Sequence, residues 1–237
     1  MSGRRAGAAL ALCLGLALAG CSSDGEGRAD LLSQVGAQVG SQISGKTRRS
    51  REKLPPATIT RTQLENTKIP ALQVNLIDRG GSDFLKRATR RNDAYPGTVA
   101  VWRGTGNTEV HLRNGVLVGT RGIGGDILSV DAGATVQAVS GARAGSGQRR
   151  YVLSDGGYGK VDLTLRCSIA NLGAATTQVV HLSYGTIHLR ETCQGGEAGD
   201  LRIVNDYWVE PGSGTVRRSI QWAGPYSGHF EMILLRN

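Results

Sequence analysis

From about residue 58 to the C-terminus, the chain consists of short segments in which apolar and polar residues alternate. In residues 160–170, Val161, Leu163, Leu165 and Ile169 fall on one face, and charged or hydroxyl residues separate most of them. A period of two marks a β-strand with one buried face. The same pattern predicts further strands over 71–78, 98–103, 108–113, 116–120, 148–154, 176–184, 186–193, 201–210, 215–223 and 229–236.

Short glycine-containing turns separate these segments, at 114–115, 155–157, 195–196 and 211–214. Connections of this length join antiparallel neighbours, so the strands are expected to form a meander. A meander of about ten strands hides its edges by closing into a barrel or by folding into a sandwich. We therefore predict one all-β domain over 58–237. It should be a soluble antiparallel β-barrel or sandwich, because the segments lack the lipid-facing alternation of a transmembrane barrel.

The N-terminus has the order of features found in bacterial lipoprotein signals. Arg4-Arg5 precedes an uncharged, largely apolar stretch over 6–20, which is too short to remain as a membrane span. Small residues come directly before Cys21, and polar residues follow it. We predict that residues 1–20 are a signal peptide and that Cys21 is lipidated. Its acyl chains would suffice for stable anchoring to a membrane.

The segment after the signal, 21–57, is predicted to be a lipidated polar tether. Ser22, where an aspartate would favour the inner membrane, predicts an outer-membrane protein that faces the periplasm. Apolar residues at helical spacing favour a short helix over 29–44, although two glycines weaken it. The basic run 46–53 could contact an anionic membrane surface, but a solvated linker is the favoured interpretation.

Four cysteines reduce to two that are available to the folded domain. Cys13 leaves with the signal and Cys21 takes the lipid, so Cys167 and Cys193 remain. In an oxidising periplasm such a pair is most simply a disulfide. Closing a loop of about 25 residues would add roughly 3 kcal/mol to stability.

The predicted strands conflict with this disulfide. If 160–170, 176–184 and 186–193 are neighbours in that order, Cys167 and Cys193 lie on strands about 10 Å apart, beyond disulfide reach. Either a strand end bends to bring them together, or the strand order there is wrong.

The net charge of +9 at pH 7 becomes +7 once Arg4 and Arg5 leave with the signal. A basic envelope protein attracts anionic lipids, phosphorylated lipopolysaccharide or acidic polysaccharide. Export from the cytoplasm argues against a nucleic-acid partner. The four histidines show no ligand spacing, so we predict neither a metal site nor a cofactor.

The densest motif runs from Trp102 to Leu128. A hairpin with an Asn114-Gly115 turn leads into a glycine loop that holds Arg121 and Asp126. The glycine spacing fits neither the dinucleotide-binding nor the phosphate-loop pattern, and no helix is predicted to follow, so the loop is not a nucleotide site. Arg121 and Asp126 could contact a sugar or partner, but an ion pair that pins the glycine loop is the favoured interpretation.

This motif resembles the signature of the YjbF/GfcB-type group 4 capsule polysaccharide lipoproteins. The resemblance rests on Trp102, on the hairpin residues 112–115 and above all on 120–127, where Ile123 and Ile127 replace the usual residues conservatively. It covers about 60–237. It implies a barrel-like periplasmic domain anchored at the outer membrane, which takes part in producing or exporting capsule or exopolysaccharide alongside polysaccharide-export proteins. No catalytic residues come with it.

The leading functional hypothesis is therefore a non-catalytic outer-membrane lipoprotein that scaffolds capsule or exopolysaccharide assembly and export. A glycan-binding module, a polysaccharide-modifying enzyme and a structural envelope protein unrelated to sugars remain alternatives. An enzyme would need two converging carboxylates; the candidates are Asp126, Asp131, Glu191, Asp206 and Glu231. For glycan or partner contact, the candidates are Trp102, Arg121, Asp126 and Trp208, with Tyr207 and Trp222 as further stacking faces.

Overall fold

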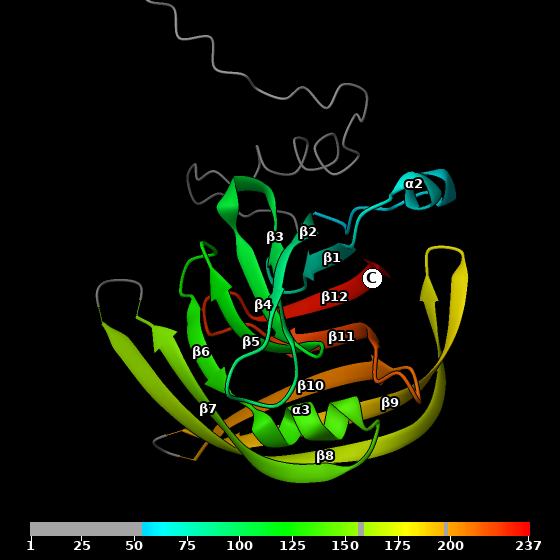
Figure 1. Cartoon of the computed structure of the whole chain (residues 1–237). Coiled ribbons are helices and arrows are strands. Elements are labelled where there is room, and N and C mark those ends of the chain that lie inside the picture. The colour runs from blue at the N-terminus through cyan, green and yellow to red at the C-terminus, as the bar shows by residue number, and fades with distance from the viewer. Residues whose placement is uncertain (1–53, 156–158, 197–198) are drawn as a thin grey trace, which may run out of the picture.

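The computed structural model describes residues 54–155, 159–196 and 199–237. These residues form one antiparallel sheet of twelve strands with two short helices and a 3-10 turn (Figure 1). The strands are β1 (Ala71–Leu76), β2 (Ser82–Arg91), β3 (Val99–Arg103), β4 (Glu109–Arg113), β5 (Val116–Arg121), β6 (Ile127–Asp131), β7 (Gly145–Ser154), β8 (Lys160–Val179), β9 (Leu182–Gly195), β10 (Leu201–Val209), β11 (Val216–Trp222) and β12 (His229–Arg236). The helices are α2 (Arg61–Asn66) and α3 (Gly133–Ser140), and the 3-10 turn is η1 (Thr105–Asn107). The predicted all-β fold is confirmed.

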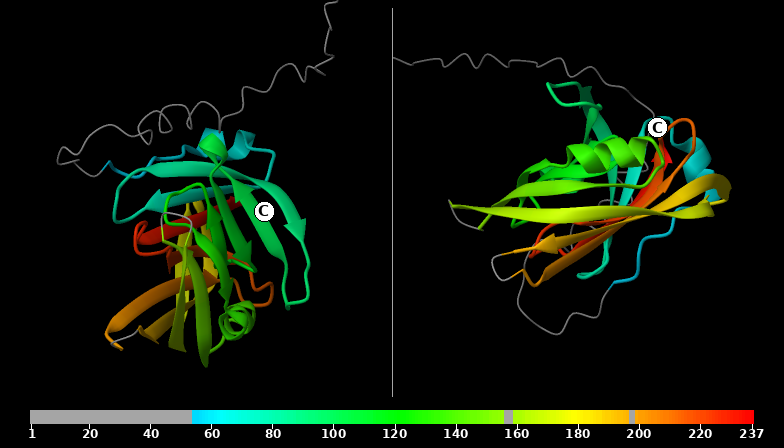
Figure 2. Two further views of the ribbon diagram at one scale, coloured as in Figure 1. Left: turned by 90° about the vertical axis from the view of Figure 1, so that its left-hand side faces the viewer. Right: turned by 90° about the horizontal axis from the view of Figure 1, so that it is seen from below.

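The strand order shows how the sheet curls into a nearly closed barrel (Figures 1 and 2). Strands β1–β5 form one meander and β6–β12 form another, and the pairing of β1 with β12 joins them. The two edges of the sheet are β5 and β6, which are consecutive in the chain. The edges therefore meet at one seam, and of the two predicted architectures the protein adopts the barrel.

Apolar side chains from both meanders fill the interior of the barrel. The largest cluster includes Leu72, Leu85, Trp102, Leu117, Ile127, Leu165, Ile203, Phe230 and Met232. Helix α3 closes one end, where Val136 and Val139 pack with Leu189 and Tyr207 of the sheet. Gly147 permits this close approach, because a Cβ there would lie 2.3 Å from the side chain of Ala134.

The predicted strand over 176–184 was wrong, and the correction resolves the cysteine conflict. β8 is one long strand, and the chain reverses at Val180 and His181. Cys167 and Cys193 are therefore directly opposite each other on adjacent strands, with Cα atoms 4.0 Å apart, and they form the predicted disulfide. Gly173, at φ 97°, lies in a β-bulge within β8, in the gap between the predicted strands over 160–170 and 176–184.

Five elements were not predicted: β2, β6, α2, α3 and η1. β2 contains an irregularity beside Ala88 that breaks its alternation, and most residues of β6 are exposed or half-buried. The predicted signal peptide, most of the predicted tether and the helix over 29–44 lie outside the described residues. Within the described part, neither helix is long and apolar enough to cross a membrane.

Candidate functional site

The glycine loop between Thr120 and Ile127 closes the seam of the barrel. The Asp126 carboxylate accepts hydrogen bonds from the backbone N–H groups of Gly122 (2.9 Å) and Ile123 (3.2 Å) and from the Thr120 hydroxyl (3.1 Å). The Thr120 oxygen in turn accepts from the Ile127 N–H at 2.9 Å. These side-chain bonds tie the edge strands β5 and β6 together, so the loop has a structural role that explains its sequence.

Arg121 takes no part in this closure. Its side chain is exposed, and among the described residues it forms no hydrogen bond or ion pair, with Asp126 or otherwise. The predicted ion pair between Arg121 and Asp126 is therefore wrong, but the predicted structural role of Asp126 in holding the loop is confirmed. The glycines are needed as well, because a Cβ at Gly125 would lie 2.2 Å from the ring of Tyr226.

Trp208 lies on the outer surface of the barrel, in a stack with two neighbours. The His188 ring is parallel to it at 4.5 Å, and the Arg218 guanidinium lies 4.6 Å from its centroid. His188 and Arg218 come from the strands on either side of β10, so they flank the indole. This arrangement leaves Trp208 without an open face on which a sugar ring could stack.

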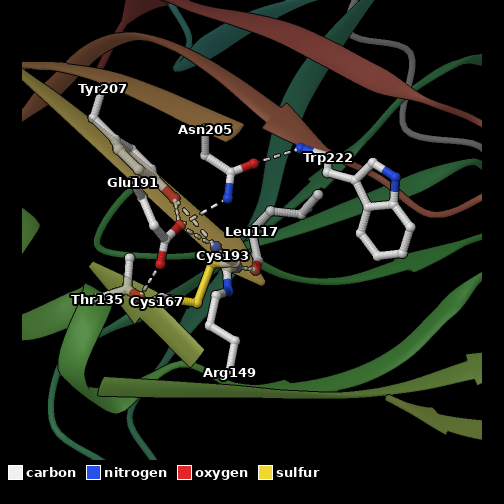
Figure 3. The surroundings of a disulfide bond; sticks show 9 residues. All are labelled: Leu117, Thr135, Arg149, Cys167, Glu191, Cys193, Asn205, Tyr207 and Trp222. Carbon is white, nitrogen blue, oxygen red and sulfur yellow. Dashed lines mark hydrogen bonds and ion pairs between the residues drawn. A yellow bond between two sulfur atoms is a disulfide. The ribbon is translucent and has the colours of Figure 1, made fainter. Parts of the chain in front are cut away.

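Glu191 lies at the centre of a buried polar network inside the barrel (Figure 3). Its carboxylate accepts from Arg149 (2.7 Å), Asn205 (2.7 Å), Tyr207 (3.1 Å) and Thr135. Burial acts to raise the pKa of Glu191, but the Arg149 charge and these hydrogen bonds hold it below the ordinary value. The network therefore keeps a buried ion pair charged.

Arg149 also helps to close the seam. Its guanidinium donates to the backbone carbonyl of Leu117 on β5 at 3.0 Å, and so connects β7 to the far edge strand. Gln221 from β11 adds bonds to the Leu117 N–H and the Gly115 carbonyl, both at 2.8 Å. Backbone groups that an edge strand would leave unpaired are thereby satisfied from within the barrel.

The carboxylates considered for catalysis do not converge on one pocket. Glu191 is buried against Arg149, and Asp126 holds the seam loop. At the barrel surface, Asp206 is paired with His188 and Arg190. Glu231, also at the surface, is paired with Arg218. Asp131 is exposed at the end of β6. Glu191 and the two cysteine sulfurs lie within 4.8 Å of one another, as metal ligands would. The disulfide and the Arg149 ion pair already engage these atoms, so they are not a free ligand set.

A pocket of about 240 Å³, which we call the barrel mouth, opens between β2, β3 and the turn that joins β10 to β11. Trp102 projects from β3 into its wall, and its side chain is only 4% exposed. The Trp102 Nε1–H has no hydrogen-bond partner among the described residues. A buried donor without a partner is costly in a folded protein. The described residues hold three other such atoms, in Arg149, Tyr151 and Arg217, and of the four residues only Trp102 lines the mouth.

Two arginines of β2 lie at the same mouth. In the β2–β3 register, Arg87 is opposite Trp102 and Arg90 is opposite Ala100, and Ala88 is the extra residue of a bulge between them. Without that bulge, residues three apart on a strand would point to opposite faces; with it, Arg87 and Arg90 both line the mouth. This is why sequence reasoning missed them, although the basic run 86–91 was a visible signal.

The two arginines bring two positive charges to the mouth. The Arg87 guanidinium lies 5.9 Å from the Trp102 ring and donates to the Asn237 side-chain oxygen at 3.0 Å, whereas the Arg90 guanidinium has no partner in the described part of the chain. Burial and the nearby Arg90 charge lower the pKa of Arg87. No acidic side chain of the described residues lines the mouth. Of the predicted contact residues, only Trp102 lines it, and Arg121, Asp126 and Trp208 lie elsewhere.

Comparisons with known proteins agree with this fold. The crystal structure of the hypothetical lipoprotein YmcC from Escherichia coli K12 matches with a TM-score of 0.64 at 18% identity, covering 76% of this chain and 89% of that one. A search of curated protein sequences gives no match. Residues 45–235 match the model of the YjbF family, described as group 4 capsule polysaccharide lipoprotein gfcB, YjbF. The chain therefore belongs to the YjbF family of group 4 capsule polysaccharide lipoproteins.

Proposed function

We propose that the protein is a non-catalytic lipoprotein that contacts the glycan during capsule or exopolysaccharide assembly and export. The lipid on Cys21 anchors it to the outer membrane, and the tether 21–57 holds the barrel in the periplasm beside polysaccharide-export proteins. The family match over 45–235 supports the link to capsule polysaccharide. The single observation that carries the glycan contact is the barrel mouth, where the unpaired indole donor of Trp102 lies beside Arg87 and Arg90.

The interior of the barrel supports contact at the mouth rather than passage of a glycan through the barrel. Apolar side chains and the Glu191 network fill the described interior, and α3 packs into one end. A non-catalytic role is favoured because the candidate carboxylates are paired with arginines, hold a loop or lie exposed away from the mouth. In this proposal the barrel provides a rigid contact surface, and the lipid on Cys21 holds that surface at the membrane.

Deleting the gene should reduce surface polysaccharide, and a copy encoding Cys21→Ala should not restore it. The alanine variant cannot receive the thioether-linked lipid, so the barrel would no longer be held at the membrane. Surface polysaccharide is measured by uronic-acid or total-carbohydrate assay of washed cells, and lipidation by incorporation of labelled palmitate. A copy encoding Glu65→Gln, a change in the exposed Arg61–Glu65 pair, is the matched control and should restore wild-type levels. Unchanged polysaccharide in the deletion strain would refute the proposal.

A further inference from the structure

We infer that the barrel mouth is a binding site for one carboxylate-bearing sugar unit of an acidic polysaccharide, with Arg87 and Arg90 facing the carboxylate and Trp102 donating to a sugar oxygen. This inference rests on the proposed function, because it assumes that the ligand is a glycan. It goes further in naming the chemical class of the sugar and the residues that select it.

The first argument is the hydrogen-bonding capacity of Trp102. An indole can only donate, so the group that satisfies its buried Nε1–H must be an acceptor, such as a sugar ring or hydroxyl oxygen. Trp102 is almost fully buried and lines the mouth, so the mouth is the side from which we expect the acceptor to approach. Arg87 lies over the ring of the same indole and brings a positive charge close to that acceptor.

The second argument is charge. Burial and the neighbouring Arg90 charge lower the pKa of Arg87, and no acidic side chain among the described residues that line the mouth offsets the two charges, so an anion between the arginines would relieve their repulsion. A guanidinium presents several N–H donors in a planar fork that matches the two oxygens of a carboxylate. The bulge at Ala88, which places both arginines on one face, makes this pairing a property of the fold.

The third argument is size and polarity. At about 240 Å³ the mouth is smaller than the roughly 300–1,000 Å³ of pockets that hold drug-sized ligands, so it suits a single sugar ring. Leu72, Leu112 and Leu234 offer an apolar wall to the C–H groups of a ring. Much of the remaining lining is polar. It includes the hydroxyl and amide groups of Thr98, Asn114, Ser140, Ser213 and Thr215, which hydrogen-bond to one another or to nearby residues. A free inorganic anion would leave the apolar wall unused, which favours a sugar carboxylate.

The test is calorimetric titration of the full-length lipoprotein in detergent at low salt. Trigalacturonic acid is the carboxylated probe, maltotriose the neutral probe and inorganic phosphate the simple anion. We expect trigalacturonic acid to bind at least tenfold more tightly than either of the others. Arg90→Gln should weaken that binding at least tenfold, and Trp102→Phe about fivefold, because each removes one donor.

Arg91→Gln is the matched control. It removes the same charge one residue along the strand, but Arg91 lines a different pocket, so binding should stay within twofold of wild type. Arg90 is exposed, so its variant should fold even if Trp102→Phe does not. Equal losses for Arg90→Gln and Arg91→Gln would overturn the inference, and so would phosphate binding as tightly as trigalacturonic acid. Tight maltotriose binding lost in Trp102→Phe would overturn the carboxylate selectivity alone and leave the proposed function standing.

Discussion

Glu191→Gln should lower the free energy of unfolding by about 3–5 kcal/mol, the cost of leaving one partner of a buried ion pair uncompensated. Arg149 and Glu191 are both almost completely buried and 2.7 Å apart, and Arg149 has no water-exposed route by which to be solvated. Glutamine keeps the shape: its one amide oxygen can still accept from Asn205 and Tyr207, and its NH2 group can donate to the Thr135 hydroxyl, so most of the loss reports the charge. Urea unfolding of the full-length protein in detergent, followed by tryptophan fluorescence, measures it.

A double variant, Arg149→Met with Glu191→Gln, should recover part of this loss because the orphaned charge is gone. Glu65→Gln, in an exposed ion pair, should leave the unfolding curve almost unchanged. The difference between wild type and Glu191→Gln should also depend on pH. The folded pKa of Glu191 is lowered from 4.5, so its contribution is complete above pH 4.5 and is lost as the pH falls through the folded pKa. A loss below 1 kcal/mol at pH 7 would contradict the importance of this pair.

Replacing Cys167 and Cys193 together by alanine should lower the free energy of unfolding by roughly 2–4 kcal/mol, mainly because the unfolded chain loses a cross-link over 26 residues. Both side chains are buried in the barrel, so some packing is lost as well. Alanine is preferred to serine because it buries no hydroxyl group without a partner. The measurement is again urea unfolding of the full-length protein.

Dithiothreitol provides the control for this prediction. It should shift the unfolding midpoint of the wild type towards that of the double alanine variant, and it should leave the variant unchanged. A wild-type midpoint that does not respond to the reductant, even after cycles of unfolding and refolding, would show that the bond does not stabilise the protein.

Features governed by local chemistry could be predicted from the sequence. The alternation in 160–170 identified a strand of the barrel, and Asn114-Gly115 marked the β4–β5 hairpin because both residues adopt positive φ, at 45° and 86°. The cysteine pairing followed from elimination and compartment. The resemblance around 120–127 identified the family, although the structure shows that Asp126 serves closure of the seam there.

Features set by irregular strands could not be predicted. The turn between β8 and β9 contains no glycine, although Val180 there has a φ of 58°. Gly173, in contrast, lies within β8. The position of the glycine therefore predicted the turn at the wrong residues. The bulge at Ala88 interrupts the alternation of β2, so neither the strand nor the position of Arg87 and Arg90 on the same face of it could be predicted. The mouth itself depends on β2, β3 and the β10–β11 turn coming together, which is a long-range property of barrel closure.

The indole resonances of the protein test the central claim, that the mouth of this lipoprotein binds an acidic sugar, most directly. The chain has three tryptophans, so ¹⁵N-labelled full-length protein in micelles should give three indole N–H signals, and Trp102→Phe identifies the one at the mouth. Adding trigalacturonic acid should shift the Trp102 signal along a saturable curve and leave that of Trp208, stacked on the outer surface, in place. A Trp102 signal that does not move at saturating trigalacturonic acid would contradict the account.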